Sequence, residues 1–322
     1  MGSELSKRYS VEQDATATGG HGYQWKVYDA TRKKDGLECS VFVFDKAALE
    51  KRLGSKRSGL SKIVVEIMRR DCNALAEMAG VSREELARSQ AAAPQPSTLR
   101  EQMLQGMSEK MGTTATHVAR ATRRSPPGVL QLIETFENRQ ALVFVGERTV
   151  SSIGNAVRGE GCAGLSTKST GRDWRSVRMS PPEVARGVVS LCEALAATHT
   201  GVGGVCHRRL HLGVSPESVF VSKAGGWRLG GYGFALPLPE APRNQNDGAM
   251  TPNNDERIPC PFFRDGPPGA SVGGGGGAGG YGSRATESAA AESTTGRPRL
   301  SYCAPEMTLM GGGGFASRAA DT

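Results

Sequence analysis

The chain has 322 residues, a net charge of +8 and a hydrophobic fraction of 38%, which is enough for one large domain or two small ones with an apolar core. Its seven cysteines are odd in number and include no CxxC or CxxxC pair, which argues against a disulfide framework or a zinc knuckle and favours reduced thiols in the cytoplasm. No apolar run is long enough to span a bilayer, and residues 1–14 lack the apolar core of a signal peptide.

Strands are predicted at the start of the chain. Residues 11–46 indicate three of them, including a Gly-rich turn that runs into a strand at 19–30 and an apolar, β-branched and aromatic run at 37–46. Apolar residues at helical spacing then predict a helix over 60–79. We interpret the polar, Ala-rich stretch 80–125 as an insertion, although two capping-box patterns within it indicate short helices.

Strands resume after this insertion. Residues 129–138 and 140–148 follow one another closely, which predicts a tight antiparallel hairpin. We predict a short helix over 149–157 and a polar loop up to Arg178.

A long helix is predicted to begin at Ser180. This residue is a good N-cap, Pro181 stands at the first helical position and Glu183 completes a capping box. Apolar residues follow at positions i, i+4, i+7 and i+11, and we expect their face of the helix to lie in the core: Val184, Val188, Leu191 and Leu195.

Two short strands, 218–222 and 226–230, are predicted after that helix. Residues 237–299 are rich in Pro, Gly, Ser and Asn, and they cannot bury enough apolar surface to offset the entropy of ordering. We therefore predict a disordered loop there. An ordered segment is expected at 300–310, followed by a tail at 311–322.

The order of these parts resembles a protein kinase: a β-rich half, a hairpin, a long helix, a loop with His and Pro-Glu, then GYG and APE motifs. The closer resemblance is to the SCYL family, the Scy-like protein pseudokinases. It extends from about Thr16 to Met310 and rests on the segments 19–30, 40–46, 213–235 and 302–306.

The resemblance implies an α+β, bilobal fold. It places a kinase-like N-lobe at 15–148, after the tail 1–14, and a partial helical C-lobe at 149–310. Because the sequence ends at Thr322, soon after Ala304–Glu306 of the APE motif, we expect either a truncated gene product or a fragment of a longer one.

Kinases position the phosphoryl group with a lysine, a base aspartate and two oxygen ligands for magnesium. The resemblance assigns these four positions to Phe42, Gly213, Ser218 and Gly231. None of them keeps the expected side chain, and the neutral hydroxyl of Ser218 is a poor lone anchor for magnesium. We therefore expect a pseudokinase without phosphotransfer and without bound magnesium. Glu66 is our candidate for the helix carboxylate that faces the cleft in kinases.

The Gly-rich loop of kinases is partly kept. Gly20, Gly22 and Val27 match its first two glycines and its closing valine, whereas Trp25 replaces the third glycine. Two interpretations stay open, a vestigial ATP-binding loop and a plain hairpin turn. No other cofactor is expected.

The resemblance also implies a function, a cytoplasmic scaffold in vesicle traffic between Golgi and endosomes, with clathrin or coatomer components as partners. The alternative is an unconventional or weak ATP-binding kinase, which would need a replacement base and metal ligands. Nucleic acid is not expected as a partner, because the basic runs are not interleaved with aromatic residues and the single GGYGSR unit does not make an RNA-binding tail. We interpret the excess of positive charge as solvated loops and helix faces.

Overall fold

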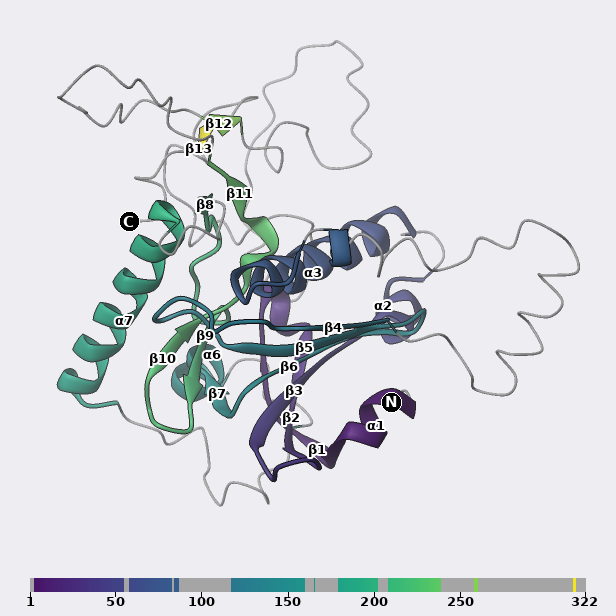
Figure 1. Ribbon diagram of the computed structural model, residues 1–322. Coiled ribbons are helices and arrows are strands. Elements are labelled where there is room, and N and C mark those ends of the chain that lie inside the picture. The colour runs from purple at the N-terminus through teal and green to yellow at the C-terminus, as the bar shows by residue number, and fades with distance from the viewer. Residues whose placement is uncertain are drawn as a thin grey trace, which may run out of the picture.

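The computed structural model of the protein describes residues 3–54, 58–82, 84–86, 117–159, 165, 179–201, 208–238, 258–259 and 315–316. These residues form an α+β fold in which a large antiparallel sheet adjoins a smaller part with one long helix and several short strands (Figure 1). The predicted fold class is confirmed.

The large sheet has six strands in the order β1-β2-β3-β6-β5-β4. The strands are β1 (Tyr9–Gly19), β2 (Trp25–Arg32), β3 (Glu38–Asp45), β4 (His117–Arg120), β5 (Leu132–Glu137) and β6 (Ala141–Glu147). All neighbouring strands pair in the antiparallel direction. The first three confirm the strands predicted within residues 11–46, and β5 and β6 form the predicted hairpin.

Helices cover both faces of this sheet (Figure 1). One face carries α1 (Ser3–Arg8), and the other carries α3 (Ser58–Met78), which confirms the helix predicted over 60–79. Side chains alternate along β3, so Phe42 packs in the cluster on the α3 side, whereas Val41 packs in the cluster on the α1 side. The continuous apolar run of β3 is explained by this burial on both faces.

A short helix, α2 (Lys46–Leu53), precedes α3 and was not predicted. Its N-cap is Asp45, whose carboxylate accepts a hydrogen bond from the backbone N–H of Ala48 at 2.8 Å. The acidic residue at the exit of β3 therefore ends the strand and starts the helix.

Two segments that we did not assign to the core sheet contribute to it. Residues 3–10 lie within the predicted tail and before the predicted strands, and they form α1 and the first two residues of β1. Strand β4 lies within residues 80–125, the predicted insertion, and pairs with β5 at the sheet edge. Most of that stretch, residues 87–116, lies outside the described residues.

The smaller part is built around α7 (Pro181–Thr200), which starts as predicted. The backbone N–H of Ser180 donates to the Glu183 carboxylate at 2.7 Å, and the capping box is complete. The other elements are β7 (Thr149–Ser152), α6 (Ile153–Arg158), β8 (Arg209–Leu210), β9 (Val219–Ser222), β10 (Trp227–Leu229), the 3-10 turn η4 (Tyr232–Phe234) and β11 (Leu236–Pro237). Only the second part of the helix predicted over 149–157 forms, because β7 pairs with β9.

The buried face of α7 differs from the predicted one. Its two leucines pack against the core as expected, but Val184 is 39% exposed and Val188 is 48% exposed, so their assignment to the core is wrong. Gly187 is buried instead, and a Cβ at this position would overlap the indole of Trp227. The missing side chain lets the helix backbone lie directly on that ring, which turns the valines outward.

The C-terminal end of the chain is described only in small part. Ile258–Pro259 (β12) pairs antiparallel with Phe315–Ala316 (β13). Apart from these pairs and the first two residues of the loop predicted over 237–299, that loop and the 311–322 tail lie outside the described residues. The APE motif also lies outside them, so the prediction made for it stays a prediction.

Candidate functional site

Phe42, which the kinase resemblance places at the phosphate-binding lysine, is completely buried. Its ring stacks on that of Phe144 with 4.2 Å between centroids and an interplanar angle of 9°. It also meets the ring of Phe220 edge-on at 5.4 Å. Because Phe144 lies on β6 and Phe220 on β9, the three rings join the large sheet to the smaller part.

Trp25 stands where kinases have the third glycine of the Gly-rich loop, and it is completely buried as well. Its ring meets Phe144 edge-on at 4.9 Å, and its indole N–H donates to Oδ2 of Asp71 at 2.7 Å. Oδ1 of Asp71 accepts the backbone N–H of Tyr232 at 2.8 Å. One carboxylate on α3 therefore links the start of β2 to η4, the turn that carries the GYG motif.

Asp71 is a buried ionisable group of this interface, with 2% of its surface exposed. Burial raises the pKa of Asp71 to about 6, and the N–H groups of Trp25, Tyr232 and Gly231 oppose the rise because they favour the charged carboxylate. The three donors saturate much of its hydrogen-bonding capacity, so the group is positioned to hold structure together.

Glu66, our candidate for the carboxylate that faces the cleft, does not do so. Its side chain is 57% exposed and pairs with Arg69 on the surface at 3.0 Å. Asp71 is the residue of α3 that reaches the interface. The sequence pattern could have indicated that Asp71 is buried and hydrogen-bonded. It follows the buried Val64 and Met68 on one helical face, and an acidic residue within an apolar stripe requires a partner.

The Gly-rich loop, which contains the 3-10 turn η1 (His21–Tyr23), is hydrogen-bonded to the loop that precedes β9. The backbone N–H of Gly20 donates to the carbonyl oxygen of Glu217 at 2.7 Å. The backbone N–H of Gly22 donates to Oε1 of Glu217 at 3.2 Å. The two backbone amides that the vestigial-loop interpretation would aim at phosphate are therefore donors to Glu217 in this structure.

Two more contacts fix this loop from either side. The imidazole of His21 meets the ring of Phe234 edge-on at 4.9 Å. The backbone N–H of Thr18 donates to Oδ1 of Asn155 at 2.8 Å, and Nδ2 of Asn155 donates to the Thr18 hydroxyl at 2.9 Å. Asn155 is completely buried on α6, so these bonds join β1 to the smaller part out of contact with water.

Ser40 is hydrogen-bonded to the backbone where β6 is followed by β7. The backbone N–H of Thr149 donates to the Ser40 hydroxyl at 2.9 Å, and this hydroxyl donates to the carbonyl oxygen of Thr149 at 3.3 Å. Val27 lies nearby, paired with Phe42 across β2 and β3, and is completely buried. Both backbone groups of Thr149 are thus bonded within the protein.

His211 and Gly213 lie in the loop that resembles a kinase catalytic loop. Nδ1 of His211 accepts the backbone N–H of Gly213 at 3.2 Å, so Nε2 carries the proton and donates to the carbonyl oxygen of Gly230 at 2.8 Å. The ring also packs on Tyr232 at 4.4 Å. Both nitrogens of this buried imidazole are bonded to backbone groups, so the ring is positioned to hold the loop in place.

Ser218 and Gly231, the positions assigned to the metal ligands, pack against each other. The Ser218 hydroxyl accepts the N–H of Ser215 at 2.9 Å and donates to the carbonyl oxygen of that residue at 2.8 Å. A Cβ added to Gly231 would lie 2.5 Å from the Cβ of Ser218. Within the described ranges, no three His, Cys, Asp or Glu side chains are grouped so that they could hold a metal ion.

The positions predicted from the sequence thus line one interface between the large sheet and the smaller part. They are Phe42, Gly213, Ser218, Gly231, Gly20, Gly22 and Val27. The side chains that hold the interface together were not predicted as site residues: Asp71, Asn155 and Glu217. Chemically, the interface offers packed rings and hydrogen bonds from backbone amides to buried side chains.

The curled antiparallel sheet, the helix α3 across it and the loop of His211 against η4 define a protein of the kinase-like, bilobal class. Curated relatives agree with this class, although no family model matches the chain. SCY1-like protein 2 of Mus musculus is 22% identical and that of Homo sapiens 20% identical, each over 237 residues. A protein kinase domain-containing protein, ppk32, of Schizosaccharomyces pombe is 23% identical over 245 residues.

These alignments cover 73–74% of this chain but only 19–25% of the relatives. The chain is related to the SCY1-like, kinase-like proteins, which confirms the resemblance read from its motifs. In the part of the chain that the structure describes, no helix has both the length and the apolar character needed to cross a membrane.

Proposed function

We propose that the chain is a catalytically inactive, pseudokinase-type binding module that serves as a scaffold or adaptor in intracellular vesicle traffic. The observation that supports inactivity is the ring stack of Phe42 and Phe144 at the lysine position. Gly213 and Gly231 offer no carboxylate beside it. A general base alone contributes about 10²–10⁴-fold to a rate, and the charged groups that stabilise phosphoryl transfer are replaced together.

Nucleotide binding is the direct test of this proposal. We expect no change in the melting temperature of the chain on addition of ATP and magnesium. A ligand at a hundred times its Kd would stabilise the folded state by about 2.7 kcal/mol, which a thermal-shift assay detects easily. Stabilisation by ATP with magnesium that Gly22→Asp abolishes would contradict the proposal and favour the alternative, an unconventional or weak ATP-binding kinase.

The trafficking role is supported by the family resemblance and not by the geometry of the interface. We propose clathrin or coatomer components as partners, met in the cytoplasm at the surface of Golgi or endosomal membranes. Co-sedimentation of the full chain with assembled clathrin or with purified coatomer tests this, with an active kinase domain as the control. Binding to neither assembly would remove the trafficking part and leave the prediction of inactivity standing.

A further inference from the structure

A basic pocket lies on the α1 side of the large sheet, on the opposite face from α3 (Figure 1). Its volume is about 510 Å³, within the range of sites for small ligands. Six basic side chains line it: Lys7, Arg8, Arg32, Lys33, Lys34 and Arg120. They come from α1, from the end of β2 and the turn after it, and from β4, so the fold gathers charges that are scattered along the sequence.

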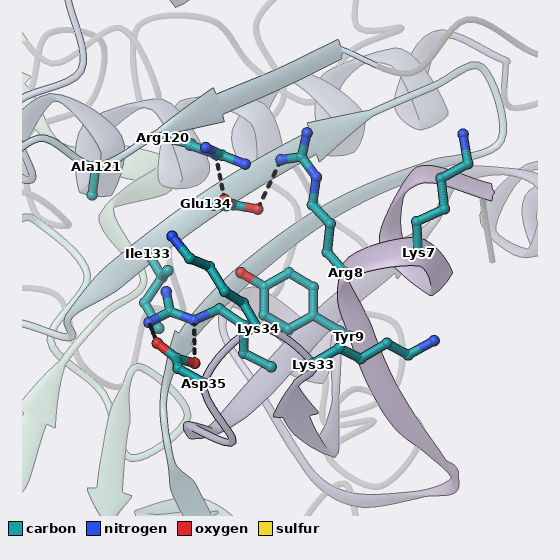
Figure 2. Close-up of a pocket in the computed structure, with 11 residues that line it drawn as sticks. Lys7, Arg8, Tyr9, Lys33, Lys34, Asp35, Arg120, Ala121, Ile133 and Glu134 are labelled. Atoms are coloured by element: carbon teal, nitrogen blue, oxygen red, sulfur yellow. Dashed lines mark hydrogen bonds and ion pairs between the residues drawn. The ribbon is translucent and has the colours of Figure 1, made fainter.

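The floor of the pocket is built around a buried carboxylate. Glu134 is 6% exposed and pairs with Arg8 at 3.3 Å and with Arg120 at 2.6 Å. Figure 2 shows the two arginines reaching this carboxylate from different sides. The Glu134 carboxylate holds both guanidinium groups in place, but its single negative charge balances only one of their two positive charges. The side chain of Arg120 remains 63% exposed.

The rim carries charge that is not compensated. The ammonium group of Lys33 donates to the carbonyl oxygen of Ser6 at 2.7 Å and has no carboxylate partner among the described residues. The ammonium group of Lys34 makes no hydrogen bond or ion pair in the described part of the chain. Lys7 pairs with Glu4, and Arg32 pairs with Asp35. Six basic groups therefore face three carboxylates, and three positive charges are left in excess.

Tyr9 adds a neutral donor at the floor of this pocket. Its side chain is 2% exposed, and its ring meets Phe136 edge-on at 6.3 Å. Burial, followed by the charge of Glu134, raises the pKa of Tyr9 above its usual range, so the hydroxyl stays protonated. In Figure 2 this hydroxyl points between Lys34 and Glu134.

We propose that this pocket binds a small ligand that carries several phosphate groups, either an inositol polyphosphate or the headgroup of a phosphoinositide. Guanidinium groups held in place by a carboxylate suit phosphate oxygens, because less side-chain freedom is lost on binding. Free lysines on the rim add charge where a second and third phosphate would lie. This inference does not rest on the proposed function, since the pocket lies on the other face of the sheet from the ring stack of Phe42.

Calorimetric titration of the full chain with inositol hexakisphosphate tests the pocket. We expect saturable binding that weakens as salt is raised. The double variant Lys33→Ala/Lys34→Ala should weaken binding by roughly tenfold or more. The matched control, Lys51→Ala/Lys62→Ala, removes the same charge from α2 and α3 and should change the affinity by less than about twofold. Both pairs are exposed, so circular dichroism should show an unchanged fold.

Vesicles identify the source of the ligand. Sedimentation with phosphatidylcholine vesicles that contain phosphatidylinositol bisphosphate, competed by inositol hexakisphosphate and lost in Lys33→Ala/Lys34→Ala, assigns the site to a lipid headgroup. Calorimetric binding without sedimentation assigns it to a soluble ligand. The proposal is overturned if inositol hexakisphosphate does not bind, if both double variants weaken its binding equally, or if only a phosphopeptide or RNA binds at this face.

Discussion

Gly231 is a position at which one added carbon should destabilise the protein strongly. Its backbone has a φ of 74° and a ψ of 35°, and an added Cβ would lie 2.5 Å from the Cβ of the buried Ser218. The left-handed conformation costs other residues about 1–2 kcal/mol, and overpacking against a buried neighbour costs about 1–3 kcal/mol. We expect Gly231→Ala to lower the free energy of unfolding by roughly 2–5 kcal/mol.

Gly213→Ala is the matched control, because a Cβ there would meet the ring of Phe234 at an ordinary 3.4 Å. In a domain of this size, each kcal/mol shifts the melting temperature by about 2–4 °C. Thermal denaturation should show a fall of about 4–20 °C in the melting temperature for Gly231→Ala, with a matching loss of unfolding free energy in urea, and a much smaller change for the control. Equal melting temperatures for the two variants would refute the reasoning, since both remove a glycine from adjoining loops.

The same geometry bears on the metal-ligand position. Gly231→Asp would add a carboxylate as well as the crowded Cβ, so it should destabilise at least as much as Gly231→Ala. We expect it to restore neither magnesium binding nor phosphotransfer.

Three further predictions follow from the interface. The folded protein binds the Asp71 proton more tightly than the unfolded chain does. The stabilisation from this proton is therefore present below about pH 4 and is lost as pH rises to about 6. Asp71→Asn should flatten this part of the curve of unfolding free energy against pH. Phe42→Ala should cost about 3–5 kcal/mol in urea denaturation. Phe42→Lys should cost at least as much, because it would place an ammonium against the buried rings of Phe144 and Phe220; a stable Phe42→Lys variant would show that the ring stack is dispensable. Asn155→Ala should leave the N–H of Thr18 without its acceptor, cost about 1–3 kcal/mol and speed hydrogen exchange at that amide, whereas unchanged exchange would mean that the bond contributes little.

The order of motifs was sufficient to predict the kinase-like fold, whereas the roles assigned to Phe42, Gly213 and Gly231 stay predictions. Motif alignment succeeds here because each position lies at a fixed offset within a local element. Asp71 was missed, since the partner of its carboxylate, Trp25, lies far away in the sequence and spacing along a chain does not show which elements cross. The pocket was missed for the same reason: Arg8 on α1 and Arg120 on β4 share the carboxylate of Glu134 on β5, and these three elements lie far apart in the sequence.

The orientation of α7 shows another limit of sequence patterns. Apolar spacing identified a stripe that includes Val184 and Val188, but it did not show which of several apolar residues would face the core. The contact of Gly187 with Trp227 decides that, and a glycine contributes nothing to a hydrophobic pattern. A close contact that depends on a glycine therefore leaves no mark in the apolar pattern of the helix.

The bonds between Thr18 and Asn155 and between Gly20 and Glu217 bear on how the molecule moves. In active kinases the Gly-rich loop closes over its ligand, and catalysis depends on that motion. Here hydrogen bonds within the protein already fix the Gly-rich loop to the smaller part. The large sheet and the smaller part should therefore move as one rigid body and unfold in a single cooperative transition. If the two parts move together in this way, the surfaces that they expose keep a constant orientation relative to each other.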